Sequence, residues 1–240
     1  MQANRPAAPG KGEVWVWQAQ LAAGRERLDV LQSLLGPGEC ERAASFAFER
    51  DRQRFVASHG ILREILGHCL GAEPSHLAFE NGPHGKPRLS GTCLAGDLRF
   101  NMSHSEDVAL YALARGCEVG IDVEVIRQDL EVQELARQFL SASEAAALDA
   151  LPESERPAGF VDFWVLKEAW SKAMGCGLSI SPVQFEVAGL RSRVPKTVSA
   201  QFGSQGTRTW SLQLLDAGPG YSAALAVEGQ CRSVRQWEWR

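Results

Sequence analysis

The residues best suited to chemistry lie in one short segment, the sequence GIDVE at residues 120–124. Side chains alternate between faces along a β-strand, so Asp122 and Glu124 would share one face while Ile121 and Val123 point to the other. Two neighbouring carboxylates repel each other unless a cation lies between them, and oxygen ligands suit Mg²⁺. A half-exposed strand with a solvated acidic face would show the same alternation, so the pattern alone leaves both interpretations open.

A second group of charged residues lies in a predicted helix, at residues 164–172. Trp164, Glu168 and Lys172 are spaced four residues apart and therefore share one helix face. Glu168 is a candidate third carboxylate for the metal, and Lys172 and Lys167 are candidate cations for phosphate oxygens. An exposed Glu–Lys pair that only stabilises the helix would give the same spacing.

Two turn segments could hold an anion. Residues 85–87 read Gly-Lys-Pro, and there Lys86 and backbone N–H groups could face a phosphate. The segment is not a P-loop, because Pro87 stands in place of the Ser or Thr. Ser103 and His104 follow a predicted strand, where the histidine could be a hydrogen-bonding or cationic phosphate ligand. An ordinary hairpin turn and a structural histidine are the alternatives.

Residues 141–144, Ser-Ala-Ser-Glu, match a helix capping box. In that interpretation Ser141 is the N-cap and Glu144 bonds back to it. The Glu144 carboxylate could instead face the metal site and act as a general base. The motif by itself is explained by the capping function.

These segments belong to a chain that alternates between helical and strand-like stretches. We expect strands at residues 14–17, 77–79, 88–89, 98–102, 108–114, 118–125, 183–187, 197–202, 209–215 and 221–227, and helices at residues 21–35, 39–70, 131–139, 143–151 and 159–174. Residues 115–117 are short enough for a hairpin. Each half runs helices first and strands later, which is an α+β pattern. Residues 108–114 resemble residues 221–227, which suggests two similar halves that meet near residue 116.

Composition narrows the class of protein. The chain has 240 residues, 45% hydrophobic and 22% charged, which excludes global disorder. The formal net charge of −4 gives no overall basic field for nucleic acid. No apolar run approaches the ~20 residues of a membrane span, and residues 1–12 resemble a loose tail and not a signal peptide. The 6 cysteines show neither zinc spacing nor a dense disulfide pattern, so we expect a cytoplasmic protein. From its charge and hydropathy we expect no nucleic-acid or membrane partner.

In combination and in this order, the segments resemble the motif series of the 4′-phosphopantetheinyl transferases, in particular the Sfp-like branch. The matching segments are GKP at residues 85–87, FNMSHS at 100–105, VGIDVE at 119–124 and FWVLKEAWSK at 163–172. The resemblance spans roughly residues 37–228. It implies an α+β pseudo-dimer of two similar halves, residues 13–116 and 117–228, with the active site in the cleft between them. Residues 229–240 would form a C-terminal tail.

The resemblance implies an enzyme that attaches the phosphopantetheine arm of coenzyme A to a serine of an acyl, peptidyl or aryl carrier protein. Adenosine 3′,5′-bisphosphate would leave. A fused pair of halves would suffice as a monomer. Two other functions stay open: a non-catalytic module that binds coenzyme A or a carrier protein, and a Mg²⁺-dependent phosphohydrolase. The intact set of three acids argues against the non-catalytic module.

The resemblance also implies roles for single residues. The residues that match the family's Mg²⁺ ligands are Asp122, Glu124 and Glu168. Lys172 matches a lysine that contacts the phosphates and assists the leaving group, and Glu144 aligns with a proposed base. The residues expected to contact coenzyme A are Arg54, Gly85, Lys86, Pro87, Ser103, His104, Lys167 and Lys172. The branch often carries lysines upstream of that arginine, whereas this chain offers only Arg42 there.

Overall fold

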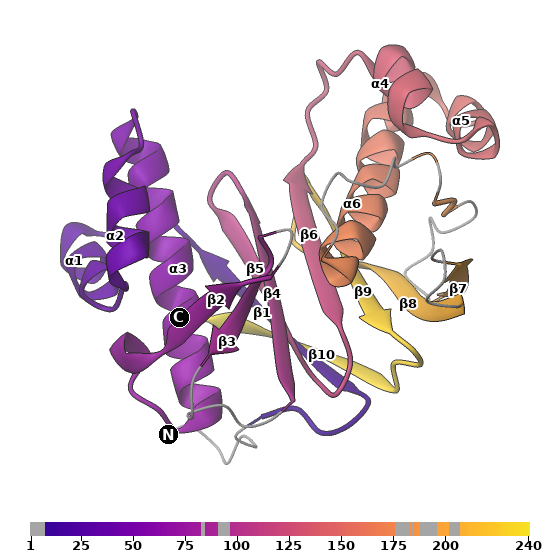
Figure 1. The fold of residues 1–240 in the computed structure, drawn as a ribbon. Coiled ribbons are helices and arrows are strands. Elements are labelled where there is room, and N and C mark those ends of the chain that lie inside the picture. Colours follow the sequence, from indigo (N-terminus) through magenta and orange to yellow (C-terminus); the bar gives the residue numbers. More distant parts are fainter. Residues whose placement is uncertain are drawn as a thin grey trace.

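Two half-molecules lie side by side, each built on a four-stranded sheet with a long helix on its outer face (Figure 1). The structure is a computed structural model that describes residues 8–82, 85–90, 97–175, 183, 185–187, 196–201 and 207–240. Most of the expected N-terminal tail, residues 1–12, therefore lies outside the described residues. None of the described helices is long and apolar enough to cross a membrane.

The first sheet has the strand order β10-β1-β5-β4. Its strands are β1 (Glu13–Gln20), β4 (Leu98–Ser105), β5 (Val108–Arg115) and β10 (Ser233–Trp239). Helix α3 (Glu49–Leu70) covers one face, where its apolar side chains join Trp15, Trp17 and Tyr111 in one core. The elements beside α3 are α1 (Arg25–Ser33), α2 (Pro37–Ala44), the 3-10 turn η1 (Pro74–His76) and the hairpin of β2 (Ala78–Asn81) and β3 (Pro87–Ser90).

The second sheet has the order β6-β9-β8-β7. Its strands are β6 (Val119–Val125), β7 (Lys196–Gln201), β8 (Thr207–Leu215) and β9 (Tyr221–Glu228). Helix α6 (Arg156–Met174) lies against β6 and β9 and ends at Gly175, which adopts the left-handed conformation (φ +67°) that stops a helix. The elements packed near its N-terminal end are α4 (Val132–Phe139), α5 (Ala142–Asp149) and the turn η2 (Glu153–Glu155).

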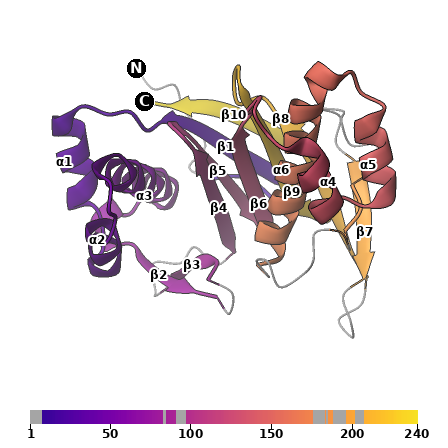
Figure 2. The same cartoon turned by 90° about the horizontal axis from the view of Figure 1, so that it is seen from above.

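The faces of the sheets that carry no long helix share one apolar core. Val16 and Leu110 of the first sheet meet Ile121, Val123 and Leu225 of the second, and all five are almost fully buried. Seen from above, the order is α3, first sheet, second sheet, α6 (Figure 2). The alternation predicted for β6 is confirmed, because its aliphatic side chains enter this core.

The two strands with similar sequences occupy corresponding positions. β5 lies between β1 and β4, and β9 lies between β6 and β8. The sheets contact each other mainly through β4, β5 and β6. Each of the two similar strands is therefore one strand away from an edge, β4 or β6, at which the halves meet.

The hairpin expected at residues 115–117 is wrong. β5 and β6 belong to different sheets, and the chain crosses between them at Gly116, which has φ +70°. The free edge of β6 is capped by side chains of β4. The N–H of Ile121 donates to Asn101 Oδ1 at 2.9 Å, and the N–H of Val125 donates to Ser105 Oγ at 3.1 Å.

Other elements differ from expectation at their ends. The single helix expected at residues 39–70 is two helices, because the backbone is extended at Phe48 (φ −109°, ψ 132°). No strand runs through the described part of residues 183–187, where Phe185 instead stacks on Trp170. The expected tail at residues 229–240 contains strand β10, which pairs in parallel with β1.

Candidate active site

Asp122 is the buried centre of a polar cluster where the two halves meet. Its Oδ1 accepts hydrogen bonds from Lys172 Nζ on α6 at 2.6 Å and from Ser103 Oγ on β4 at 2.8 Å. Lys172 Nζ also donates to Ser103 Oγ at 2.9 Å. The Oδ2 atom of Asp122 is buried and has no hydrogen-bond partner. A buried, unpartnered carboxylate oxygen is costly, and a cation would satisfy it.

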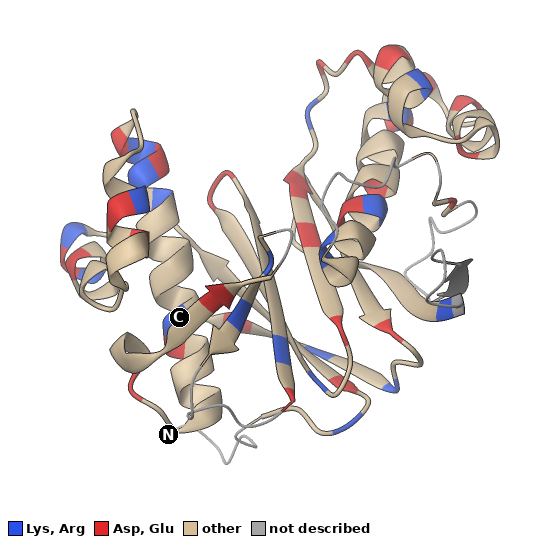
Figure 3. Ribbon diagram, in the orientation of Figure 1, with Lys and Arg blue, Asp and Glu red and all other residues tan. Residues whose placement is uncertain are grey.

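Gly120 allows α6 to approach β6 closely enough for these contacts. A Cβ atom at this position would overlap the carbonyl oxygen of Ala169 and the backbone of Ala173 on α6. Gly120 and Asp122 face the same side of β6, so the helix that lies on the glycine also carries Lys172 to the aspartate. Figure 3 shows acidic positions along β6 next to acidic and basic positions on α6.

Glu124 and Glu168 lie close enough to Asp122 for their charges to interact. Burial, followed by the nearby Asp122 carboxylate, raises the pKa of Glu124, and the same two causes raise the pKa of Glu168. Glu124 also accepts a hydrogen bond from Ser105 Oγ at 2.8 Å. The three expected acids thus lie on one flank of the molecule. In the described residues, however, no group of three or more His, Cys, Asp or Glu side chains is arranged so that it could hold a metal ion.

His104 and Arg54 are two basic side chains beside this cluster. Loss of hydration lowers the pKa of His104, and the nearby cations Lys172 and Arg54 lower it further. Arg54 donates from Nε to Asp107 Oδ1 at 2.9 Å and from Nη2 to Glu106 Oε2 at 2.7 Å. These residues therefore form a basic flank near Asp122.

Lys86 occupies a different environment from the one expected. Its ammonium group donates to Glu118 Oε2 at 2.8 Å and to the carbonyl oxygens of Val119 and Ala173, both at 3.0 Å. A lysine has three N–H donors, so none is left for a phosphate in this conformation. Burial lowers the pKa of Lys86. The Lys86 side chain thus connects the segment after β2 to the last turn of α6. Gly85 (φ +84°) lies just before β3, and Pro87 is the first residue of β3.

Glu144 and Lys167 pair with each other. Glu144 is fully buried; its Oε2 accepts from the N–H of Ser141 and lies 2.8 Å from Lys167 Nζ, and its Oε1 accepts from the N–H of Val187 at 2.6 Å. Lys167 also donates to the carbonyl oxygen of Phe185 at 2.6 Å. The capping box is confirmed. Among the described residues, the contacts of the Glu144 carboxylate are with Ser141, Val187 and Lys167, and none is with the acids of the cluster.

Sequence reasoning missed Asn101 and Ser105. Both side chains hold β6 against β4, and Ser105 also positions Glu124. The spacing of Asn101, Ser103 and Ser105 places all three on one face of a strand, so the alternation of polar residues could have revealed them. We expected the strand to end before Ser103, which hid this pattern.

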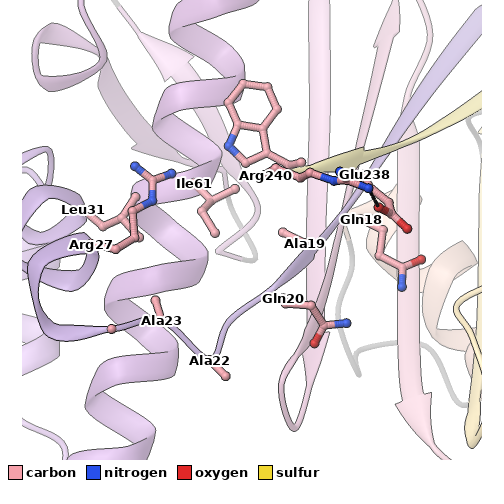
Figure 4. A pocket seen from close by; sticks show the side chains of 12 residues that line it. Gln18, Ala19, Gln20, Ala22, Ala23, Arg27, Leu31, Ile61, Glu238 and Arg240 are labelled. Atoms are coloured by element: carbon pink, nitrogen blue, oxygen red, sulfur yellow. Dashed lines mark hydrogen bonds and ion pairs between the residues drawn. The ribbon is translucent and has the colours of Figure 1, made fainter.

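A cavity of the first half lies apart from this cluster. This cavity of about 420 Å³ lies between β1, α1, α3 and β10, on the first half alone (Figure 4). Its lining includes Gln18, Arg27, Ile61 and Glu238. The candidate reactive side chains lie in the cluster around Asp122 and not in this cavity.

Fold and site define an α+β protein of two similar halves, with a buried aspartate–lysine pair and two further carboxylates where they meet. The family model of the 4'-phosphopantetheinyl transferase superfamily matches residues 118–226. The family model described as 4'-phosphopantetheinyl transferase, N-terminal, matches residues 17–115.

Curated relatives agree with the family models. The chain is 34% identical over 227 residues to 4'-phosphopantetheinyl transferase HetI of Nostoc sp., covering 95% of this chain and 92% of the relative. It is 25% identical over 204 residues to 4'-phosphopantetheinyl transferase Sfp of Bacillus subtilis, covering 85% of this chain and 86% of the relative. The chain belongs to the 4′-phosphopantetheinyl transferase superfamily and is an enzyme of the Sfp-like type. This family uses coenzyme A to act on carrier protein domains.

Proposed function

We propose that this enzyme transfers the 4′-phosphopantetheine group of coenzyme A to a serine hydroxyl of an apo acyl, peptidyl or aryl carrier protein. Adenosine 3′,5′-bisphosphate is the product that leaves. The observation that supports this proposal most directly is the convergence of Asp122, Ser103 and Lys172 from β6, β4 and α6. A charged site that lies between two halves can hold a polyanionic substrate and a second protein at once.

The residues around Asp122 fit a magnesium ion. The donors are carboxylate oxygens, which Mg²⁺ prefers. Asp122 Oδ2 is buried without a partner, and mutual repulsion contributes to the raised pKa values of Glu124 and Glu168. We propose that these three carboxylates hold the ion. When bound, Mg²⁺ would supply positive charge that withdraws electron density from the pyrophosphate of coenzyme A.

The side chains of the chain itself bind and orient the substrate. Lys172 is held at 2.6 Å from Asp122 and is 31% exposed, so it presents a fixed cation to phosphate oxygens at the rim of the cluster. The lowered pKa of His104 keeps its imidazole neutral near pH 7, so it would bind an anion through a hydrogen bond. Arg54 supplies a further cation on the same flank. In-line positioning and charge stabilisation then account for most of the rate.

We propose a structural role for Glu144 in place of the base suggested by the resemblance. A general base must receive a proton at an accessible oxygen. Both carboxylate oxygens of Glu144 are engaged, and the side chain is fully buried. Its contacts hold Lys167 and therefore support α6, the helix that carries Glu168 and Lys172.

The test is incubation of the purified protein with coenzyme A, Mg²⁺ and an apo carrier domain, followed by mass spectrometry of the carrier. We expect a mass gain of one phosphopantetheine group, and no gain when the metal is removed by a chelator. Asp122→Ala should lower the rate by at least about a hundredfold, because a charged group at the reacting centre is lost.

The matched control is Asp129→Asn, an exposed acid in the segment after β6, which should transfer at the wild-type rate. Release of free phosphate without a mass gain would support the phosphohydrolase instead. Binding of coenzyme A without either product would support the non-catalytic module. Full activity of Asp122→Ala would refute the metal assignment.

A further inference from the structure

The turn between β4 and β5 holds a carboxylate in an unfavourable backbone conformation. Glu106 has φ +49°, and it is the one non-glycine residue with positive φ in the described part of the chain. Glycine or asparagine adopts this conformation more readily than glutamate. Residues kept in such a conformation often serve a function, so the contacts of the Glu106 side chain are informative.

The Glu106 carboxylate joins arginines from the two halves. Its Oε2 accepts from Arg54 Nη2 on α3 at 2.7 Å, and its Oε1 lies 3.4 Å from Arg127 Nη2, just after β6. Figure 3 shows this acidic turn between α3 and the end of β6. The carboxylate therefore bridges a basic residue of the first half, Arg54, and one of the second half, Arg127.

Arg54 is held by two carboxylates that use different nitrogens. Asp107 accepts from Nε at 2.9 Å, and Glu106 accepts from Nη2. These two nitrogens form the edge with which a guanidinium binds a carboxylate or a phosphate side-on. The Arg54 side chain is 13% exposed, so an incoming anion has few other directions of approach. An anionic ligand must therefore compete for Nη2.

Glu106 has a second partner, Arg127, whereas the Asp107 carboxylate contacts only Arg54 among the residues that the structure describes. If an anion displaced Glu106 from Arg54, its carboxylate would keep the contact with Arg127. The bond from Arg54 Nε to Asp107 would continue to orient the guanidinium. The two acids on this turn thus have different functions. Asp107 orients the Arg54 guanidinium, and Glu106 binds its Nη2 atom in place of a ligand.

We propose that Glu106 is an internal competitor for the phosphate-bearing adenosine end of coenzyme A, and that it sets the affinity of Arg54 for that end. This inference rests on the proposed function, because it takes Arg54 to be a phosphate contact. Displacement of Glu106 accompanies binding, and its return to Arg54 accompanies departure of the bisphosphate product. Glu106 is therefore a residue that determines ligand affinity, and it is not a catalytic residue.

The test measures binding of adenosine 3′,5′-bisphosphate to the full chain by calorimetry, without coenzyme A or a carrier. Glu106→Gln and Glu106→Asn both remove the charge, and only asparagine also relieves the positive φ. We expect both to bind roughly five- to tenfold more tightly than the wild type, with the gain shrinking at high salt. Asp107→Asn should bind more weakly, because Arg54 loses its orienting partner.

Two controls test whether the effect acts through Arg54 and the 3′-phosphate. In an Arg54→Gln background, Glu106→Gln should give no gain, since the two residues act on each other. Adenosine 5′-monophosphate, which lacks the 3′-phosphate, should show a smaller gain. Tighter binding by Glu106→Asn alone would assign the effect to the backbone and overturn the inference. Weaker binding by Glu106→Gln, unchanged binding by both variants, or undetectable binding by every protein would also overturn it.

The readout also separates this inference from the proposed function. Carrier modification by the wild type, together with weaker bisphosphate binding by Glu106→Gln, would leave the transferase function standing and overturn the competitor. Absence of carrier modification, together with tighter binding by the variants, would do the reverse. Thermal unfolding of each variant checks that it is folded.

Discussion

At the scale of residues, three lysines in the motif segments have different environments. Lys86 and Lys167 are buried, and burial lowers the pKa of each. Both donate to a backbone carbonyl oxygen and pair with a carboxylate, Glu118 for Lys86 and Glu144 for Lys167. Lys172 is partly exposed and lies on Asp122. The first two stabilise the position of α6, and the third is the cation available to a substrate. This division explains why lysines adjacent in a motif need not share a function.

Glu144→Gln should destabilise the fold by about 3–5 kcal/mol, because it removes the buried carboxylate that lies 2.8 Å from the buried Lys167 ammonium. Glu144→Gln combined with Lys167→Met should recover much of that loss. Chemical denaturation measures both. We also expect Glu144→Gln to lose less transfer activity per folded molecule than Asp122→Ala. If the ranking were reversed in folded protein, Glu144 would be a base after all.

At the scale of elements, the contact between β6 and α6 determines the site. Asp122 is placed by a strand whose aliphatic side chains enter the shared core, and Lys172 by a helix that lies directly on Gly120. The side chains of Asn101 and Ser105 add the third element by fastening β4 to the edge of β6. The active geometry therefore depends on the separation of elements as much as on the acids themselves.

Gly120→Ala should push α6 away from β6 and lower both stability and transfer. Overpacking at such a contact costs about 1–3 kcal/mol, and displacement of Lys172 should cost activity beyond that. Gly38→Ala is the matched control, because Gly38 lies in α2 with open space around its added Cβ. It should be neutral or slightly stabilising. Equal behaviour of the two variants in denaturation and transfer assays would contradict the close-approach argument.

At the scale of the whole molecule, the chain returns to the first half at its C-terminal end. After β9 it forms β10, which pairs with β1 and carries Trp237 onto Trp17 (ring centroids 4.7 Å apart) and Trp15 (5.1 Å). Both ends of the described chain therefore contribute to one sheet, and the shared core joins that sheet to the other. Such connections favour unfolding of the two halves as one cooperative unit.

Trp237→Ala should destabilise the protein by about 2 kcal/mol, since it removes a half-buried aromatic side chain from this cluster. Arg235→Ala, on the same strand with an exposed side chain, should change stability by less than about 0.5 kcal/mol. Thermal or urea unfolding compares the two. A separate unfolding transition for each half in the wild type would argue against a single cooperative unit.

Local chemistry was readable from the sequence. Strand periodicity placed Asp122 and Glu124 on one face, the capping box predicted the start of α5, and Gly175 predicted the end of α6, because each depends on neighbours within a few residues. The ordered motif series also indicated the family, since several weak local patterns in a fixed order are rarely shared by chance.

Only the tertiary structure decided which distant groups meet. It separated β5 from β6 into two sheets, paired Lys167 with Glu144 and Lys86 with Glu118, and brought β10 beside β1. The partner of a lysine or of a strand edge is set by packing between elements far apart in the chain. Local periodicity and propensity carry no information about that packing, so the same motif can bind a substrate or fasten a helix.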